Sequence, residues 1–250
     1  MSENETRVAL VTGGTQGIGS GITRRLALDG AKVVTGCINP PSVVEPFVAK
    51  LKEEDGVEID SRYANFANPA DCQKIIDDIV RDYGRIDYLV NNAGIVRDRT
   101  ALKMQLLDFD QVMKTNLYGP FFLIKAALPH FLEAGFGRVV NISSFVAETG
   151  RIGQSNYAAA KAGLIGMSKT LALETATKGV TVNCIIPGAI KTEMTAKLPE
   201  DILQAVIDTV PMGEMGTPED IASGVAFFCR DDARYITGAV LPVTGGLLMM

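Results

Sequence analysis

The stretch R-V-A-L-V-T-G-G-T-Q-G-I-G, residues 7–19, decides the fold. An apolar run, residues 7–12, leads into a glycine-rich turn and then into a segment with helical apolar spacing, residues 18–29. In such a strand-turn-helix unit, Gly13 permits the tight turn, Gly17 lets the backbone approach a pyrophosphate, and Gly19 allows close packing of helix on strand. The first helical turn offers free N–H groups to phosphate oxygens. The stretch predicts a dinucleotide site, the alternative being a glycine turn without a ligand; its spacing is G-x-x-x-G-x-G rather than the commoner G-x-G-x-x-G.

Strand-like and helix-like segments alternate along the rest of the chain. This alternation predicts an α/β fold: one Rossmann-like domain, residues 1–250, with a doubly wound parallel sheet of seven strands and helices on both faces. No Pro/Gly/Ser-rich linker and no repeat divides the sequence. The predicted strands are 7–12, 32–36, 58–64, 88–91, 138–143, 180–186 and 239–243; the predicted helices are 18–29, 43–54, 69–83, 111–133 with a bend at Pro120, 156–177, a helix-rich segment 191–215, and a helix capped at Thr217.

Composition narrows the class of protein. Of the 250 residues, 47% are apolar and 21% are charged, which excludes a disordered chain. The formal net charge is −5 and no basic run is present, so nucleic acid is not an expected partner. No apolar stretch reaches the ~18 residues of a membrane helix, and no signal peptide is visible. We therefore expect a cytoplasmic protein without a membrane partner.

The cysteines and the single histidine exclude two further chemistries. Cys37, Cys72, Cys184 and Cys229 form no C-x-x-C pair and are expected to be buried thiols in a reducing compartment. His130 lies in an apolar helical segment. One histidine cannot build a His-rich metal site, and a Ser-His-Asp hydrolase would have to use this one. We expect no metal.

A second motif, Tyr157-Ala-Ala-Ala-Lys161, places two reactive side chains on one helical face. Alone it is weak evidence, because a surface Tyr–Lys pair has the same spacing. However, Ser144 lies thirteen residues earlier, just past the carboxyl end of a predicted strand, where ligands of open parallel sheets bind. The sequence N-N-A-G, residues 91–94, ends another strand at the same edge, and Asn116 lies in the helix that follows.

Together these motifs resemble the short-chain dehydrogenase/reductase family, from Thr12 to the T-G-G of residues 244–246. The resemblance implies a nicotinamide-dependent oxidoreductase in which Tyr157 is the general acid that protonates a ketone oxygen. Lys161 is implied to lower the pKa of this tyrosine and to hold the nicotinamide ribose. Ser144 is implied to bind the carbonyl oxygen and Asn116 to hold a water of the proton relay. The nicotinamide supplies the hydride, so no metal is needed.

The same resemblance implies the cofactor contacts. Asn65 stands at the adenine position, although a turn-forming Asn is the alternative. The segment after the second strand reads G-C-I-N-P, residues 36–40, without the acid typical of NAD enzymes, and no base occurs from there to residue 49. NADH or NADPH is expected, with the missing base favouring NADH or acceptance of both. The implied contacts are Gly13, Thr15, Gln16, Gly17, Ile18, Gly19, Cys37, Asn65, Asn92, Ala93, Gly94, Tyr157, Lys161, Pro187, Gly188, Ile190 and Thr192.

Within the family, the chain is most similar to the acetoacetyl-CoA reductases of polyhydroxybutyrate synthesis and to the 3-oxoacyl-acyl-carrier-protein reductases. G-Q-S-N-Y, residues 153–157, and a C-terminus of the type G-G-L-x-M carry this similarity. It implies an (R)-3-hydroxyacyl product and substrate contacts at Arg151, Ile152, Gln154 and Ala189.

Two of these substrate contacts depart from the relatives. Arg151 replaces a neutral residue, and Ala189 stands where many relatives have an aromatic one. An acidic carrier protein would need a basic patch, to which Lys178 contributes but Gly135 does not, so the CoA thioester is favoured. Other ketones, and a non-catalytic dinucleotide-binding sensor, remain alternatives.

Two features concern motion and assembly. The segment 191–215 is predicted to form a substrate lid, the alternative being a plain surface insertion. Met194, Met212 and Met215 would line an acyl channel or simply fill the core. The resemblance also implies a homotetramer, in which the two long helices pair across two-fold axes.

Overall fold

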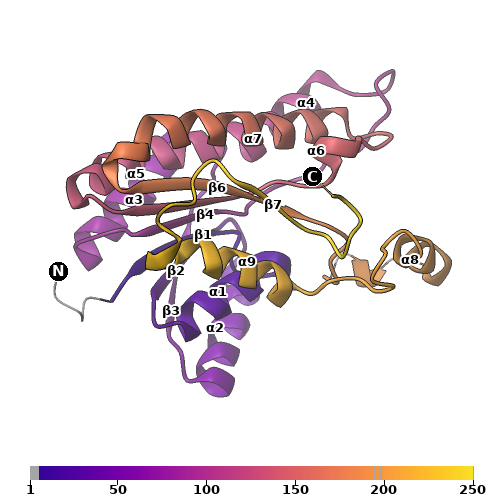
Figure 1. The fold of residues 1–250 in the computed structure, drawn as a ribbon. Coiled ribbons are helices and arrows are strands. Elements are labelled where there is room, and N and C mark those ends of the chain that lie inside the picture. Colours follow the sequence, from indigo (N-terminus) through magenta and orange to yellow (C-terminus); the bar gives the residue numbers. More distant parts are fainter. Residues whose placement is uncertain (1–5, 194, 198, 250) are drawn as a thin grey trace.

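A computed structural model describes residues 6–193, 195–197 and 199–249. Seven parallel strands form one sheet in the order β3-β2-β1-β4-β5-β6-β7, with helices on both faces (Figure 1). The predicted fold class is thereby confirmed. The strands are β1 (Val8–Thr12), β2 (Lys32–Cys37), β3 (Ile59–Tyr63), β4 (Tyr88–Asn91), β5 (Gly137–Ile142), β6 (Val180–Pro187) and β7 (Val240–Val243). The α-helices are α1 (Gly17–Leu28), α2 (Pro41–Asp55), α3 (Pro69–Tyr83), α4 (Leu106–Met113), α5 (Gly119–Ala134), α6 (Val146–Thr149), α7 (Ser155–Thr175), α8 (Glu200–Ile207) and α9 (Pro218–Cys229).

Two apolar cores hold the helices to the sheet, one on each face. Because side chains of a strand alternate between the faces, Leu10 and Leu89 enter one core while Val11 and Val90 enter the other. The first core lies under α3, α5 and α7, and the second lies under α1, α2 and α9 (Figure 1). The inner strands are largely apolar because helices cover both sides of them, whereas the edge strand β3 carries Asp60, Ser61 and Arg62.

The strand order opens a crevice at the carboxyl ends of β1 and β4. The chain moves outward from β1 to β2 and β3, then returns to β4 on the other side of β1. The connections therefore diverge at this point, which is where open α/β sheets bind their ligands. The glycine turn and the N-N-A-G segment follow β1 and β4 and so lie at this crevice.

The predicted helix 111–133 differs from the observed one. The helix begins at Leu106 as α4, passes through a π-helical turn at Lys114–Tyr118, and continues as α5. The π-turn contains Asn116, which is fully buried. Such turns occur mostly as single insertions and frequently at functional sites. The short helix α6 was also not predicted, and β2 extends one residue further than predicted, to Cys37.

The segment 191–215 leaves the body of the protein after β6 and returns to it before α9, and near its end Met212 N donates to Gly245 O at 3.1 Å. An isolated bridge joins Ile190 to Gly216, with hydrogen bonds of 2.8 Å from Lys191 N to Gly216 O and 3.0 Å from Gly216 N to Ala189 O. Within this segment, α8 has no buried residue and projects away from the sheet (Figure 1). Among the helices of the described residues, none is long and apolar enough to span a membrane.

Candidate active site

The glycine turn forms a cradle of backbone groups at the start of α1. Gly13 and Gly17 have φ of 64° and 52°, a conformation that favours glycine. A Cβ on Gly19 would lie 2.1 Å from Gly13 O, so only glycine lets the helix come this close to the turn. No side chain caps the N-terminus of α1. Its first N–H groups and the positive end of its dipole therefore suit a phosphate group.

Thr12 holds the N-N-A-G segment next to this turn through hydrogen bonds. The Thr12 hydroxyl accepts hydrogen bonds of 2.9 Å from the N–H groups of both Asn92 and Ala93. In return, Asn92 Nδ2 donates to Thr12 O at 2.9 Å. Thr192 lies over the other side of the turn, with its Cγ2 3.6 Å from the position of a Cβ on Gly17. Three segments that are distant in sequence thus meet around the predicted dinucleotide site.

Three side chains of the predicted tetrad gather at the end of β5. Ser144 follows β5, Tyr157 lies in the first turn of α7, and Lys161 lies one turn later. Ser144 and Tyr157 share a hydrogen bond. Lys161 is only 3% exposed, and its Nζ donates to Ile142 O at 2.7 Å and lies 5.7 Å from the centroid of the Tyr157 ring.

The protonation of Tyr157 and Lys161 is governed by burial. Burial raises the pKa of Tyr157, the hydrogen bond with Ser144 opposes this rise, and the negative charge of Asp98 adds to it. Burial also lowers the pKa of Lys161 from 10.5 to about 8. The net shift of the Tyr157 pKa is upward because desolvation of the phenol is the largest effect, and the lowering by Lys161 that the resemblance implies stays a prediction.

Asn116, the fourth predicted member, is held by the chain segment after β4. Its Oδ1 accepts from Ile95 N at 2.8 Å and its Nδ2 donates to Ile95 O at 2.9 Å. A Cβ on Gly94 would lie 3.3 Å from Asn116 Oδ1 and 3.7 Å from Lys161 Nζ. Gly94 thus lies between Asn116 and Lys161, at a position where a methyl group would crowd Asn116 Oδ1.

A buried polar chain behind the tetrad was missed by sequence reasoning. Asn91 Nδ2 donates to Asn141 Oδ1, and Asn141 Nδ2 donates to Ser168 Oγ, each at 2.7 Å. Cys184 Sγ lies 3.1 Å from the same hydroxyl. These bonds connect β4, β5 and β6 to α7 and fix the helix that carries Tyr157 and Lys161. The sequence signal that could have revealed this chain is the presence of Asn91 and Asn141 near the ends of the mostly apolar strands β4 and β5.

The outer cofactor positions vary in exposure. Asn65 forms a turn, because its Oδ1 accepts from Ala67 N at 3.1 Å, yet its residue remains exposed. Cys37 is buried as the last residue of β2, and Ile190 is buried beside the bridge to Gly216. Gln16 is exposed at the start of α1, while Thr15 is buried and accepts from Asn39 Nδ2 at 3.2 Å. At the end of β6, Pro187 is buried and Gly188 N donates to Val243 O at 3.0 Å.

The predicted substrate residues surround the entrance to α7. Gln154 is buried and its Nε2 donates to Asp98 Oδ2 at 2.9 Å. Arg151 is exposed, Ile152 is 92% exposed, and Ala189 is partly buried after β6. Asp98 itself was not predicted, since nothing in the sequence shows that its loop contacts α7.

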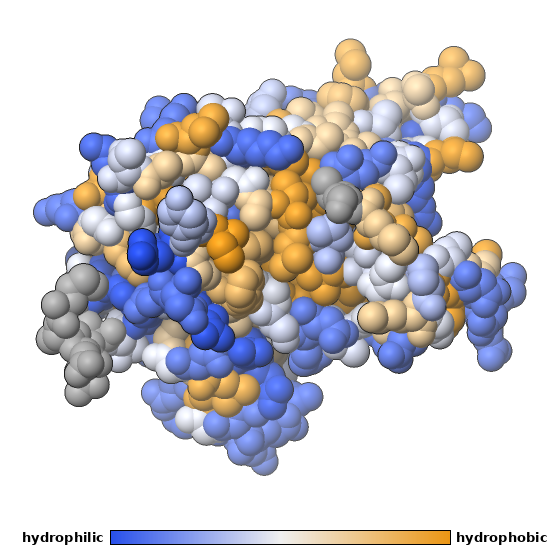
Figure 2. Space-filling model, in the orientation of Figure 1, coloured by the Kyte–Doolittle hydropathy of each residue, from blue (hydrophilic) through white to orange (hydrophobic). Residues whose placement is uncertain are grey.

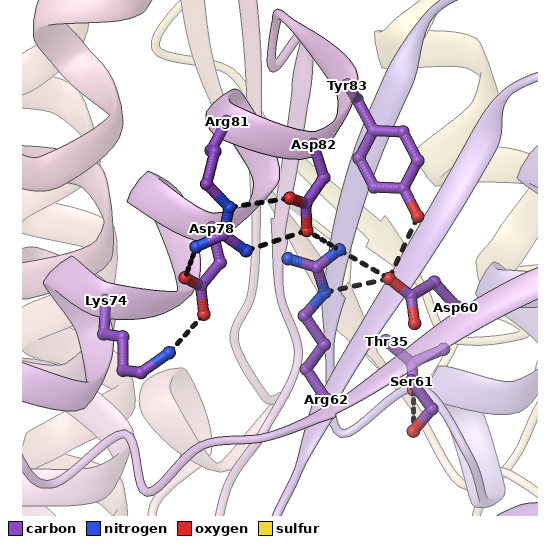
Figure 3. A network of polar contacts seen from close by, with 9 residues as sticks. All are labelled: Thr35, Asp60, Ser61, Arg62, Lys74, Asp78, Arg81, Asp82 and Tyr83. Atoms are coloured by element: carbon purple, nitrogen blue, oxygen red, sulfur yellow. Dashed lines mark hydrogen bonds and ion pairs between the residues drawn. The ribbon is translucent and has the colours of Figure 1, made fainter.

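The end of β2, where a charged selector of the ribose 2′-position is expected, lies beside Arg62 of β3. Arg62 stands opposite Gly36 in the register of β2 and β3. Its side chain points toward α3, where its Nη2 lies 2.6 Å from Asp60 Oδ2 and 2.9 Å from Asp82 Oδ2 (Figure 3). Tyr83 donates to the same oxygen of Asp60 at 3.0 Å. These ion pairs hold the guanidinium group of Arg62 on the face of the sheet opposite α2.

Comparisons with known proteins agree with this geometry. Residues 13–248 match the family described as enoyl-(acyl carrier protein) reductase. The chain is 42% identical to an acetoacetyl-CoA reductase of Allochromatium vinosum, covering 97% of this chain and 99% of that protein. It is 39% identical to a 3-oxoacyl-[acyl-carrier-protein] reductase of Thermotoga maritima, covering 98% and 99%, and 42% identical to nodulation protein G of Azospirillum brasilense, covering 96% and 98%. The chain therefore belongs to the short-chain dehydrogenase/reductase family of NAD(P)H-dependent oxidoreductases.

The nicotinamide nucleotide of this family fits the residues of the crevice. The uncapped start of α1 and the backbone cradle at Gly13 and Gly17 suit its pyrophosphate. Thr192 covers the cradle from the other side, and Ala93 lies beside Gly13. Among the described residues, no group of three or more His, Cys, Asp or Glu side chains is placed to bind a metal ion.

Proposed function

We propose that this protein reduces 3-oxoacyl thioesters and that its reaction is acetoacetyl-CoA to (R)-3-hydroxybutyryl-CoA, a step of polyhydroxybutyrate synthesis. The observation that carries the proposal is the meeting of Ser144, Tyr157 and Lys161 beside the dinucleotide crevice. The names of the relatives, which include an acetoacetyl-CoA reductase and 3-oxoacyl-[acyl-carrier-protein] reductases, support the substrate class.

In the proposed mechanism, each tetrad residue acts on the substrate oxygen or on the proton it receives. When bound, the reduced nicotinamide supplies a hydride to the C3 carbonyl carbon. Ser144 donates a hydrogen bond to the carbonyl oxygen and stabilises its developing negative charge. Tyr157 gives its phenolic proton to that oxygen, which completes the alcohol.

The tyrosine then needs a new proton. Lys161 is close enough to Tyr157 to stabilise the transient phenolate, and its ammonium group can return a proton. Asn116 and Lys161 both lie beside Gly94. We propose that a water held by Asn116 carries the proton relay from solvent to Lys161.

CoA is proposed as the carrier, with the acyl-carrier-protein thioester as the alternative. Gly135, at a position where a basic docking residue would be expected, ends α5 with φ of 61°. A lysine or arginine there would be strained, because such a φ favours glycine. Lys178 remains exposed but alone makes a weak surface for an acidic protein.

For the cofactor, we propose that NADPH is not strongly preferred over NADH. Beyond the end of β2 lies a cavity of about 790 Å³, whose lining includes the carboxylate residue Glu45 and the apolar Val44 and Val48. A 2′-phosphate gains most from Arg or Lys, whereas Glu45 would repel it. Arg62 also borders this cavity, but its guanidinium is paired with Asp60 and Asp82.

We further propose that the chain is one domain, residues 1–250, in which residues 191–215 close over the substrate. This proposal is supported by the bridge between Ile190 and Gly216, where the segment leaves and rejoins the body, and by α8, which has no buried residue. Of its methionines, Met212 is 77% exposed and Met215 is buried, so Met215 fills the core; Met194 lies outside the described residues.

Assembly into a homotetramer is proposed from two apolar surfaces. One is on α5, where Tyr118 at its start and Phe121 are half exposed. The other lies at the β7 edge of the sheet, near Tyr235, and Figure 2 shows apolar residues gathered over that edge. The cysteines are free and buried, which supports a reducing, cytoplasmic setting.

One kinetic comparison tests the function and the cofactor. Acetoacetyl-CoA and an acetoacetyl carrier-protein thioester are each offered with NADH and with NADPH, and the nicotinamide absorbance is followed. We expect reduction with a higher kcat/KM for the CoA thioester, and less than a hundredfold preference for NADPH, which corresponds to about 2.7 kcal/mol. Absence of turnover would favour the non-catalytic sensor, and full activity of Tyr157→Phe would refute the proton-donor assignment.

A further inference from the structure

Of the arginines that the structure describes, most are paired with carboxylates, and three of the five that are not lie at one place. Among the described residues, Arg97, Arg99, Arg151 and Arg234 have no carboxylate within ion-pair distance, and Arg138 is buried without one. Arg97, Arg99 and Arg151 lie around the start of α7, and Arg234 follows α9. The paired arginines are Arg7, Arg24, Arg25, Arg62, Arg81, Arg85 and Arg230.

Hydrogen bonds hold the three neighbouring arginines together. Arg99 N donates to Gly153 O at 2.9 Å, and Asn156 Nδ2 donates to Arg97 O at 3.0 Å. The loop with Arg97 and Arg99 therefore lies against the residues between Arg151 and Tyr157. We call Arg97, Arg99 and Arg151 the rim arginines.

The charged groups of the rim arginines are free to bind an anion. Within the part of the chain that the structure describes, the guanidinium of Arg97 donates to Val96 O at 3.0 Å and that of Arg99 to Asp98 O at 2.8 Å, and neither pairs with a carboxylate. All three residues are exposed. The carboxylate between them, Asp98, accepts from Gln154 instead. Three positive side chains on segments that lie against each other favour an anion that carries several negative charges.

The rim arginines lie next to the proposed reaction centre. Tyr157 directly follows Asn156, whose side chain donates a hydrogen bond to the backbone carbonyl of Arg97. Asp98, which lies between Arg97 and Arg99, raises the pKa of Tyr157 through its negative charge. An extended substrate with its carbonyl at Tyr157 and its anionic end outside would therefore pass these residues. Guanidinium groups bind phosphates with paired, charge-assisted hydrogen bonds.

We propose that the rim arginines bind the phosphate groups of the CoA carrier. The inference rests on the proposed function, because it places the thioester carbonyl at Tyr157. CoA joins a reactive thioester at one end to a pyrophosphate and a 3′-phosphate at the other. The flexible pantetheine arm between them lets the acyl group reach Tyr157 while the phosphates remain at the surface.

To separate phosphate binding from the chemical step, we compare two substrates that carry the same acyl thioester. Acetoacetyl-CoA carries the phosphates, and acetoacetyl-N-acetylcysteamine lacks them. The variants are Arg99→Gln, Arg151→Gln and the double variant, with Arg234→Gln as the matched control because Arg234 is also unpaired but follows α9. We expect KM for acetoacetyl-CoA to rise about five- to tenfold for each arginine, since an exposed charge-assisted bond contributes at the lower end of its range.

Added salt should distinguish the two thioesters in the same way as the variants do. kcat/KM of the wild type for acetoacetyl-CoA should fall with added salt, while that for the N-acetylcysteamine thioester should change little. The double variant should lose this difference, and Arg234→Gln should keep it.

Several results would overturn the inference. Equal losses on both thioesters would show that the arginines shape the reaction centre, and no loss on either would show that they do not contact substrate. A larger loss with a carrier-protein thioester than with acetoacetyl-CoA would assign the rim to the protein carrier. If the wild type reduces neither thioester, the proposed function fails rather than the assignment of the rim.

Discussion

Replacement of Lys161 by methionine is expected to make the protein more stable and inactive. Burial lowers the pKa of Lys161 from 10.5 to about 8, and each unit of pKa corresponds to 1.36 kcal/mol, so the buried ammonium destabilises the fold by about 3 kcal/mol near neutral pH. Lys161→Met removes this charge but also the hydrogen bond to Ile142 O, which contributes about 1 kcal/mol. We expect the free energy of unfolding at pH 7 to rise by about 2 kcal/mol.

The stability of the wild type should also change with pH, in a direction that follows from the lowered pKa of Lys161. The pKa of Lys161 is lower in the folded protein than in the unfolded chain, so the unfolded chain binds the proton more tightly. Stability of the wild type should therefore increase from about pH 8 to pH 10.5 as this proton is lost. Lys161→Met has no such proton, and its stability advantage should shrink over the same range.

Urea unfolding of the nucleotide-free protein measures both effects. The wild type and Lys161→Met are compared at pH 7 and pH 9.5 at one fixed protein concentration, since assembly makes stability concentration-dependent. Lys169→Met, an exposed lysine on the same helix, is the control and should change stability by less than about 0.5 kcal/mol. A Lys161→Met protein less stable than the wild type at pH 7 would refute the reasoning.

Two further predictions concern the surroundings of the tetrad. Gly94→Ala places a methyl group 3.3 Å from Asn116 Oδ1, which the two bonds to Ile95 hold in place. We expect the free energy of unfolding in urea to fall by about 1–3 kcal/mol and kcat to fall as well, whereas unchanged kcat would show that the proton relay does not depend on the position of Asn116. Asp98→Asn removes a negative charge that disfavours the phenolate, so the limb of the pH–rate profile for alcohol oxidation that reports Tyr157 should move to lower pH, and a move to higher pH would contradict this electrostatic assignment.

The sheet and its crevice could be predicted because they depend on local patterns. Alternation of apolar strands with helical spacing is present in the sequence itself, and so is the glycine turn at residues 13–19. The π-turn at Lys114–Tyr118 could not be predicted, because apolar spacing continues through it. What accompanies it is a contact between Asn116 and Ile95, twenty-one residues apart, which no local pattern contains.

The role of individual glycines also depends on tertiary packing. Gly36 follows the pattern of a nucleotide-binding turn, yet a Cβ there would lie 2.7 Å from Phe66 and 2.9 Å from Ile75 in the core under α3. Its lack of a side chain is thus required by packing, whichever cofactor binds. Asp98, in contrast, carries no recognisable motif. It belongs to the site only because Gln154 donates a hydrogen bond to its carboxylate, a contact that tertiary packing creates.

On the proposed mechanism, the protonation state of Tyr157 suits reduction of a ketone better than oxidation of an alcohol. Reduction needs a protonated Tyr157 that can donate, whereas oxidation needs a phenolate that can accept. Burial and the charge of Asp98 both raise the pKa of Tyr157, and only the hydrogen bond with Ser144 opposes them. Lys161, with a pKa of about 8, is protonated at neutral pH and can restore the tyrosine proton. The resting protein therefore holds both groups in the protonated forms that a ketone reductase requires.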